Sequence, residues 1–167
     1  MKPANAFLAS SAGRCALLCL GLAALLLTAP SCQKVDSGDD PAAIDQGVQG
    51  KILFWQGNFM CCPVTGTKKP AARTVFFHEL TNLKQAVQHG YSSFFTDIRT
   101  RLVATTNSNR MGLYQVRQEP GRYSVFVKEG QRFYANGIDD DGNIQPVQVV
   151  AGSVCILDID ITYAAWC

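Results

Sequence analysis

The densest group of side chains that could bind a metal ion is the acidic run DDDGN, which begins at Asp139. Carboxylate oxygens of Asp139 and Asp141, with the amide oxygen of Asn143, resemble the first half of a calcium-binding loop. A complete loop of that kind needs glycine and glutamate at two later positions, where this chain has Ile144 and Val150. The run is therefore expected to be an acidic turn between strands. A weak calcium site is the alternative, and no other cofactor is expected.

The cysteines beyond residue 31 are candidates for disulfide or thiol chemistry, and they are Cys32, Cys61, Cys62, Cys155 and Cys167. They form no CxxC motif and neither histidine lies close to them in sequence, so the spacing is not that of a zinc site. If Cys32 is modified, the other four can form disulfides in three pairings in an oxidising compartment. Cys61 and Cys62 are expected to bridge to Cys155 or Cys167, because a bridge between neighbours strains the peptide. A buried core thiol is the alternative for Cys155.

Hydrolytic chemistry has little support among the remaining reactive side chains. His78 and Glu79 are adjacent, so on a strand they point to opposite faces and cannot share a zinc ion. His89 lies in a predicted loop. A serine or cysteine hydrolase needs a nucleophile beside a base, but GxSxG is absent and no motif joins Cys61 or Cys62 to His78. No catalytic residue is predicted, and the protein is not expected to be an enzyme.

Cys32 follows a segment that is typical of an export signal. Lys2 and Arg14 precede residues 15–29, which carry no charge. A basic start before a short apolar run indicates a secretory signal, and the run is shorter than the roughly 20 residues that a membrane-spanning helix needs. The motif LTAPSC, which ends at Cys32, resembles a lipobox, where the cysteine is acylated and becomes the new N-terminus. Cleavage by an ordinary signal peptidase, leaving Cys32 unmodified, is the alternative.

The chain is expected to have three parts: a lipoprotein signal peptide (1–31), a flexible acidic linker (32–47) and one domain (48–167). The linker is polar and rich in aspartate, which is typical of a tether. The signal holds two bases and no acid, so the remainder has zero net charge in place of the +2 of the full chain. A neutral chain has no general attraction for nucleic acid or for anionic lipid. The expected location is the cell envelope, lipid-anchored in the outer membrane and either periplasmic or surface-exposed.

The domain has the pattern of an all-β protein. The segment 57–70 is punctuated by glycine and proline and is predicted as a loop. The segment 81–95 is ambiguous, since a short helix could begin after Thr81 or Asn82 and end at Gly90. Strands are predicted at residues 48–56, 73–80, 101–106, 113–118, 123–128, 132–134, 144–150 and 154–163.

Alternation within these segments predicts how the strands pack. Tyr123, Val125 and Val127 share one face of their strand. In the segment 154–163 every second side chain, from Cys155 onward, is apolar, and the intervening ones are mostly polar. One apolar and one wet face is typical of an antiparallel sheet that packs on a second sheet. The expected fold is an antiparallel β-sandwich of about seven strands.

The segment 112–130, GLYQVRQEPGRYSVFVKEG, resembles the signature of carboxypeptidase regulatory-like domains, which are β-sandwiches with transthyretin-like (prealbumin-like) topology. The resemblance extends to the predicted first and last strands and covers residues 48–161. It departs from the family at Cys61 and Cys62. It implies a non-catalytic spacer, accessory part or binding module, since fold alone does not give function. The matching motif positions are Gly112, Tyr114, Pro120, Gly121 and Tyr123.

These features together predict a non-catalytic, lipid-anchored envelope protein that serves as an accessory or protein-interaction module. A glycan- or peptide-binding module of an uptake or adhesion system is the alternative. Expected partners are the membrane, through the lipid on Cys32, and an envelope protein, with a glycan in the alternative. Exposed aromatic side chains could form the binding surface. The main candidates for it are Phe94, Phe95 and Trp166.

Overall fold

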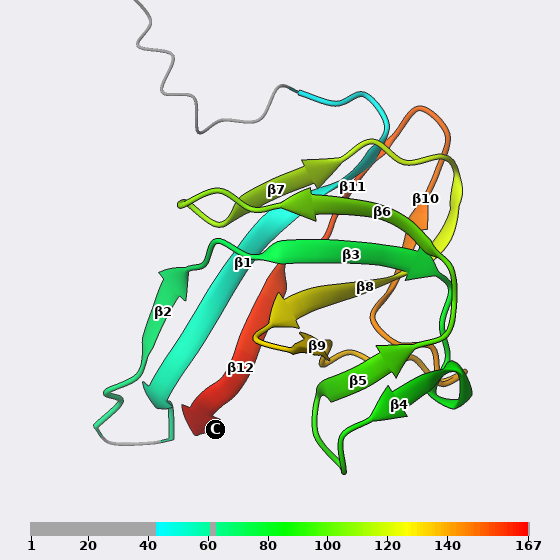
Figure 1. The fold of residues 1–167 in the computed structure, drawn as a ribbon. Coiled ribbons are helices and arrows are strands. Elements are labelled where there is room, and N and C mark those ends of the chain that lie inside the picture. The colour runs from blue at the N-terminus through cyan, green and yellow to red at the C-terminus, as the bar shows by residue number, and fades with distance from the viewer. Residues whose placement is uncertain (1–42, 61–62, 167) are drawn as a thin grey trace, which may run out of the picture. The chain divides into compact units, whose positions relative to one another are not determined.

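Two packed β-sheets, one of five strands and one of seven, make up the domain in the computed structural model (Figure 1). The structure describes residues 43–60 and 63–166. The first sheet contains β1 (Gly47–Asn58), β2 (Thr67–Pro70), β7 (Leu113–Val116), β11 (Val154–Ile156) and β12 (Ile159–Trp166). The second contains β3 (Thr74–Glu79), β4 (Ala86–Gln88), β5 (Phe94–Ile98), β6 (Leu102–Asn107), β8 (Gly121–Glu129), β9 (Arg132–Tyr134) and β10 (Pro146–Val149).

Strand β1 is the centre of the first sheet because it pairs with all four other strands. Its first half pairs with β7 in antiparallel and with β11 in parallel orientation. Its second half pairs with β2 in antiparallel and with β12 in parallel orientation. One long strand thus connects two ends of the domain, with a different pair of short strands at each end.

The strands β11 and β12 follow each other along one side of β1, and a local contact at Leu157 separates them. The Tyr114 hydroxyl donates a hydrogen bond of 2.5 Å to the carbonyl oxygen of Leu157. Gly50 makes room for that carbonyl, since a Cβ at this position would lie 1.9 Å from the same oxygen. The continuous alternation of the segment 154–163 therefore spans two strands and a break, rather than one strand.

Strand β8 is the centre of the second sheet. It pairs with β3 along one side, and with β10 and then β9 along the other. Val125 and Val127 point into the core between the sheets, as their alternation predicts. Phe126 points the other way and joins a second cluster of buried side chains, which also contains Phe95, Ala135 and Ile144.

The main core lies between the two sheets, and burial of each large apolar side chain there stabilises the fold by about 1.5–3 kcal/mol. At one end of it, Tyr163 of β12 contacts Phe54 and Phe94, with ring centroids 5.5 and 5.0 Å apart. These contacts join the first sheet to β5 of the second. Fully buried members of the core include Val48, Ile52, Val75, Phe77 and Ile161.

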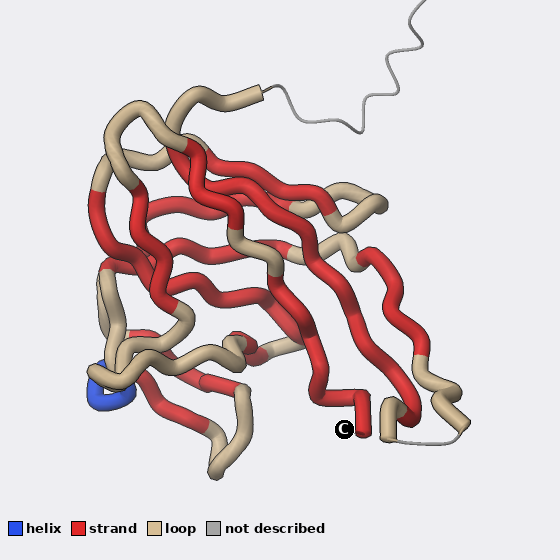
Figure 2. The backbone as a smooth tube through the Cα atoms, turned by 180° about the vertical axis from the view of Figure 1, so that it is seen from behind, coloured by secondary structure: helices blue, strands red, loops and turns tan. Residues whose placement is uncertain are grey.

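The all-β sandwich predicted from the sequence is confirmed, and several of its details differ. The described residues form twelve strands rather than about seven, and the pairings of β1 with β11 and β12 are parallel. The predicted loop 57–70 contains β2. The expected helix after Asn82 is only one turn of 3-10 helix, η1 (Leu83–Gln85), and β4 follows it directly. Figure 2 shows this single turn at the edge of an otherwise all-strand fold. Within the described residues, no helix has the length and hydropathy of a membrane span.

Candidate functional site

The acidic run at Asp139 forms a closed turn. One carboxylate oxygen of Asp139 accepts hydrogen bonds from the backbone N–H groups of Asp141 and Asn143, at 3.1 and 2.7 Å. The other oxygen accepts from the Asn143 side chain at 2.9 Å and from Arg122 at 3.3 Å. These donors, the Asn143 amide first, hold the pKa of Asp139 below its ordinary value. Both carboxylate oxygens therefore accept hydrogen bonds from N–H donors, and the weak calcium site stays a prediction. In the described ranges no three His, Cys, Asp or Glu side chains gather to hold a metal ion.

His78 is a buried structural residue of β3, with only 6% of its surface exposed. Its Nδ1 lies 3.0 Å from the carbonyl oxygen of Thr100, which identifies Nδ1 as the protonated nitrogen. The imidazole also packs edge-on against Phe126, with centroids 5.6 Å apart. Burial lowers the pKa of His78 below 6.5, and the Thr100 carbonyl partly opposes that shift. The side chain thus fills the second cluster as a neutral ring.

The lowered pKa of His78 predicts a loss of stability in mild acid. The folded state binds fewer protons here than the unfolded state, so stability is complete above about pH 6.5 and decreases as the pH falls below it. We expect the melting temperature to fall between pH 7.5 and pH 5, and His78→Asn to reduce that fall. His89→Asn is the matched control because His89 is exposed on the same sheet, in the turn after β4. An equal pH dependence in both variants would contradict the prediction.

Glu129 is a buried carboxylate at the end of β8, and its side chain is only 7% exposed. One of its oxygens accepts a hydrogen bond from Nε of Arg73, and the other accepts one of 2.9 Å from the Tyr163 hydroxyl. Burial and the neighbouring Glu129 raise the pKa of Tyr163. Glu129 belongs to β8 of the second sheet and Tyr163 to β12 of the first, so their hydrogen bond joins the two sheets. Both carboxylate oxygens of Glu129 thus stabilise this end of the core.

The residues of the family-like motif hold the turns around β7 and β8. Gly112 has a φ of +78° and its carbonyl oxygen accepts a hydrogen bond of 2.9 Å from the N–H of Ile52. Tyr114 fixes the break after β11, as described above. Pro120 and Gly121 make the turn into β8, where the Tyr123 hydroxyl donates 2.8 Å back to the carbonyl oxygen of Glu119. Each motif position therefore has a structural role in this domain.

Only one cysteine of the predicted set lies in the described residues. Cys155 is a free, partly buried thiol, so its predicted disulfide is wrong. The reason is its register beside Val48, at the start of β1. Met60 follows the far end of β1, roughly 30 Å away at about 3.3 Å per residue, whereas a disulfide needs Cα atoms within about 7 Å. The other predicted cysteines, Cys32, Cys61, Cys62 and Cys167, lie outside the described residues.

The three aromatic residues predicted to form a binding surface are not equivalent. Phe95 is fully buried in the second cluster, 5.7 Å from Phe126, so its predicted exposure is wrong. Phe94 is half-buried and packs against Tyr134 and Tyr163 in the core. Trp166 alone is strongly exposed, at 73%. The structure places it beside the end of β1, in register with Asn58.

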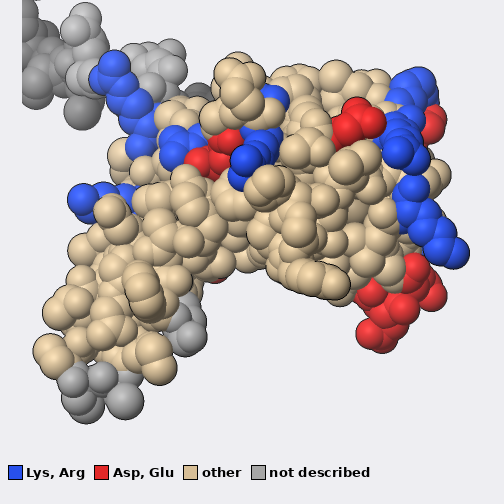
Figure 3. All heavy atoms as spheres, turned by 60° about the horizontal axis from the view of Figure 1, so that its bottom comes forward, with Lys and Arg blue, Asp and Glu red and all other residues tan. Residues whose placement is uncertain are grey.

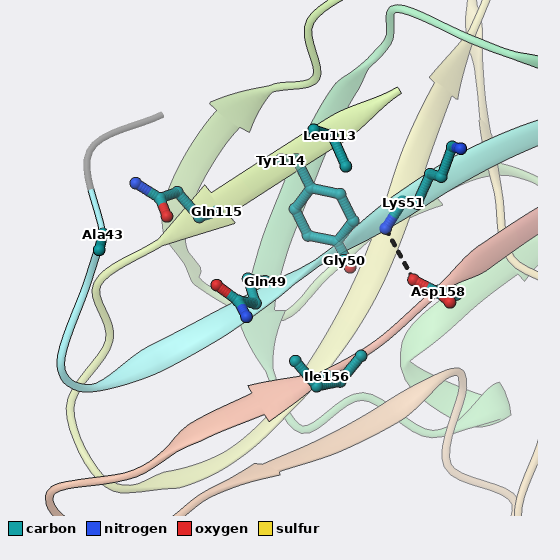
Figure 4. Close-up of a pocket in the computed structure, with 9 residues that line it drawn as sticks. All are labelled: Ala43, Gln49, Gly50, Lys51, Leu113, Tyr114, Gln115, Ile156 and Asp158. Atoms are coloured by element: carbon teal, nitrogen blue, oxygen red, sulfur yellow. Dashed lines mark hydrogen bonds between the residues drawn. The ribbon is translucent and has the colours of Figure 1, made fainter. Parts of the chain in front are cut away.

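Sequence reasoning missed a shallow groove of about 420 Å³ on the outward face of the first sheet (Figure 4). A row of side chains crosses three paired strands there, because Gln49 of β1 lies in register with Ile156 and with Gln115. Leu113 lines the groove next to this row. The Asp158 carboxylate, at its edge, accepts a hydrogen bond of 2.8 Å from the backbone N–H of Lys51. Alternation along β1 was the available signal, since it turns Gln49 away from the buried Val48.

The described domain is thus a β-sandwich with a groove across β7, β1 and β11 and with an exposed tryptophan, Trp166, at the far end of β1. Comparisons of the chain with protein-family models, with curated proteins and with solved structures find no match.

Proposed function

We propose that this protein is a non-catalytic, lipid-anchored protein of the cell envelope, most simply of the outer membrane, which works as an interaction module. The observation that carries the proposal is the arrangement along β1. The chain enters the domain at Ala43, before the start of β1, and exposed apolar side chains gather after its end at Asn58. A tether at one end of the strand leaves the other end accessible to a partner.

The polar side chains that could do chemistry support a non-catalytic role by what they contact. The imidazole of His78 contacts a backbone carbonyl, and the carboxylate of Glu129 joins Arg73 to Tyr163. Asp139 closes its own turn. These groups stabilise the fold, so their presence needs no reaction to explain it. We also propose relationship to the carboxypeptidase regulatory-like domains, supported by the structural roles of Gly112 and the other motif residues.

The anchor is tested by Cys32→Ser in a chain whose residues 1–31 are replaced by a cleavable secretory signal without a lipobox. We expect the wild-type protein in the membrane fraction and the variant in the soluble fraction, with the same far-UV circular dichroism spectrum. The physical reason is that several acyl chains anchor a protein stably, whereas a bare N-terminus does not. Wild-type protein that is soluble, or that lacks acyl groups by mass spectrometry, would refute the proposal.

A second candidate function, peptide or glycan binding, is favoured by the groove across β7, β1 and β11. The amide side chain of Gln49 beside the apolar Ile156 offers both hydrogen bonding and apolar contact, which is the usual mixture in a ligand site. Ile156→Arg should abolish binding of any peptide or glycan identified from an array, without unfolding the domain. Unchanged binding would place the ligand elsewhere.

A further inference from the structure

Three exposed apolar side chains lie where β1 and β12 end and β2 begins, and we call Met60, Val64 and Trp166 the apolar tip. Their exposed fractions are 56%, 60% and 73%. The tip lies at the end of the first sheet that is remote from β7 and β11, at lower left in Figure 1. Exposure of three such side chains at one place is unfavourable in water and indicates a contact surface.

Asn58 holds the tip together. It lies in register with Trp166, and the N–H of the next residue, Phe59, donates a hydrogen bond of 2.9 Å to the carbonyl oxygen of Trp166. The side-chain oxygen of Asn58 accepts from the N–H of Met60 at 2.8 Å. Its carbonyl oxygen accepts from Thr65, the neighbour of Val64, at 3.0 Å. Met60 and Trp166 are therefore hydrogen-bonded to the end of β1 directly, and Val64 is bonded to it through the next residue, Thr65.

Aromatic side chains pack beneath the tip. The ring of Phe59 lies 5.0 Å from that of Trp55 and directly over Gly66, where a Cβ would come within 2.4 Å of it. The ammonium group of Lys68 lies 3.4 Å from the centre of the Trp55 ring, and Asp160 accepts a hydrogen bond of 3.0 Å from the Trp55 indole. These contacts fix the described residues of β1, β2 and β12 that lie next to the tip.

The tip itself carries no charge, and charges of both signs lie next to it: Lys68 and Lys69 on β2, and Asp160 on β12. Residues 56–67 and 161–166 contain no acidic or basic side chain, and the first charges after the tip along β2 are Lys68 and Lys69. On the face in view in Figure 3, the described residues next to this end, at lower left, include scarcely any charged side chain. An uncharged apolar end followed by lysines is typical of segments that enter the interface of an anionic membrane.

We propose that the apolar tip inserts into the headgroup region of a bilayer that contains anionic lipids. A bilayer accepts a projecting apolar end, whereas a protein partner would need a matching concave surface. Exposed tryptophan favours the membrane interface, and Lys69 adds attraction to anionic headgroups. This inference deepens the proposed function and rests on it, because an anchored protein would gain a second membrane contact.

The length of the chain before the domain permits both contacts with one membrane. Ala43 follows Cys32 by eleven positions in the sequence, and at up to about 3.5 Å per position this segment can span roughly 38 Å. The strand β1 runs between the two ends of the domain. At about 3.3 Å per residue over Gly47–Asn58, its length does not exceed that span. The anchor and the tip can therefore reach the same bilayer.

The test uses the chain that begins at Gln33, which contains every described residue but carries no lipid. Its sedimentation with vesicles of phosphatidylcholine mixed with phosphatidylglycerol is compared with that of its variants. We expect binding that falls about tenfold in Met60→Ser combined with Trp166→Ala. Lys69→Gln should weaken binding about fivefold, and only with the anionic vesicles. In a Trp55→Phe background, the emission of Trp166 should shift to shorter wavelength when vesicles are added.

Val150→Ser is the matched control, because Val150 is 57% exposed but lies between β10 and β11, near the other end of β1. It should bind the vesicles as the parent chain does. Absence of vesicle binding, or an equal loss in Val150→Ser and the tip variants, would overturn the inference. Self-association that Trp166→Ala abolishes, without vesicle binding, would also overturn it and identify a second copy as the occupant. These results leave the Cys32 anchor untouched, since the lipidated chain is not used.

Discussion

Gly112→Ala is expected to lower the free energy of unfolding by about 4 kcal/mol, which is a large part of the 5–15 kcal/mol typical of a domain. Two effects add at this position. At a φ of +78°, a residue with a Cβ lowers the stability of the fold by about 1–2 kcal/mol relative to glycine. The new Cβ would also lie 2.4 Å from the carbonyl oxygen of Ile52, so that β7 must move away from β1. The movement weakens the hydrogen bond from the N–H of Ile52 to the carbonyl of Gly112. Denaturation by urea, followed by circular dichroism, measures the loss.

Gly130→Ala separates the two effects. Gly130 has a similar φ, +60°, in the turn between β8 and β9, but nothing lies within 4 Å of the Cβ that alanine would add. It should therefore lose only about 1 kcal/mol, from the backbone conformation alone. Equal losses in the two variants would show that the close approach of β1 and β7 at Gly112 contributes nothing to stability.

Residues 112–128 are the part of the fold that the sequence predicts best, because their signals are local. A glycine that begins a strand, a Pro-Gly turn and alternating Val125 and Val127 each act within a few residues. The structure uses them as expected: Gly112 turns the chain, Tyr123 closes the turn at Glu119, and both valines enter the core.

The parallel pairing of β1 with β11 and β12 could not be predicted in this way. Val48 lies in register with Cys155, and Ile52 with Ile159, so the pairing joins the two ends of the domain's sequence. Strand patterns show which face is apolar but not which distant strand is the neighbour. The break at Leu157 is equally hidden, because only the Tyr114 hydroxyl and the space at Gly50 produce it.

The error at Phe95 and the omission of the apolar tip have related physical causes. An ordinary sandwich has wet outer faces, which makes one residue of the Phe94–Phe95 pair a candidate for exposure. Here the outer face of the second sheet has its own buried cluster, in which Ile144 helps to cover Phe95. At the tip, in contrast, Trp166 lies beside Asn58, which it follows by 108 residues in the sequence, and only the register of β1 with β12 brings them together.

The second large effect is expected at the buried carboxylate of Glu129. Arg73→Met should lower the free energy of unfolding by about 3 kcal/mol, because it leaves a carboxylate charge that is only 7% exposed without its cation. Methionine retains an apolar stem near Phe54, whose ring the Arg73 guanidinium approaches at 6.0 Å. The loss therefore reports on the charge rather than on packing. Thermal and urea denaturation at neutral pH measure it.

The double variant Arg73→Met with Glu129→Gln decides whether an unpaired charge is the cause. Glutamine is neutral and can still accept the hydrogen bond that the Tyr163 hydroxyl now donates to Glu129 at 2.9 Å. The double variant should therefore recover most of the stability that Arg73→Met loses, since a neutral group costs far less to bury than an unpaired carboxylate. Arg122→Met is the control, because its ion pair with Asp139 is more exposed and such pairs contribute at most about 1 kcal/mol. If the two changes at the buried pair were additive, Arg73 would be stabilising the domain through packing and not through the charge of Glu129.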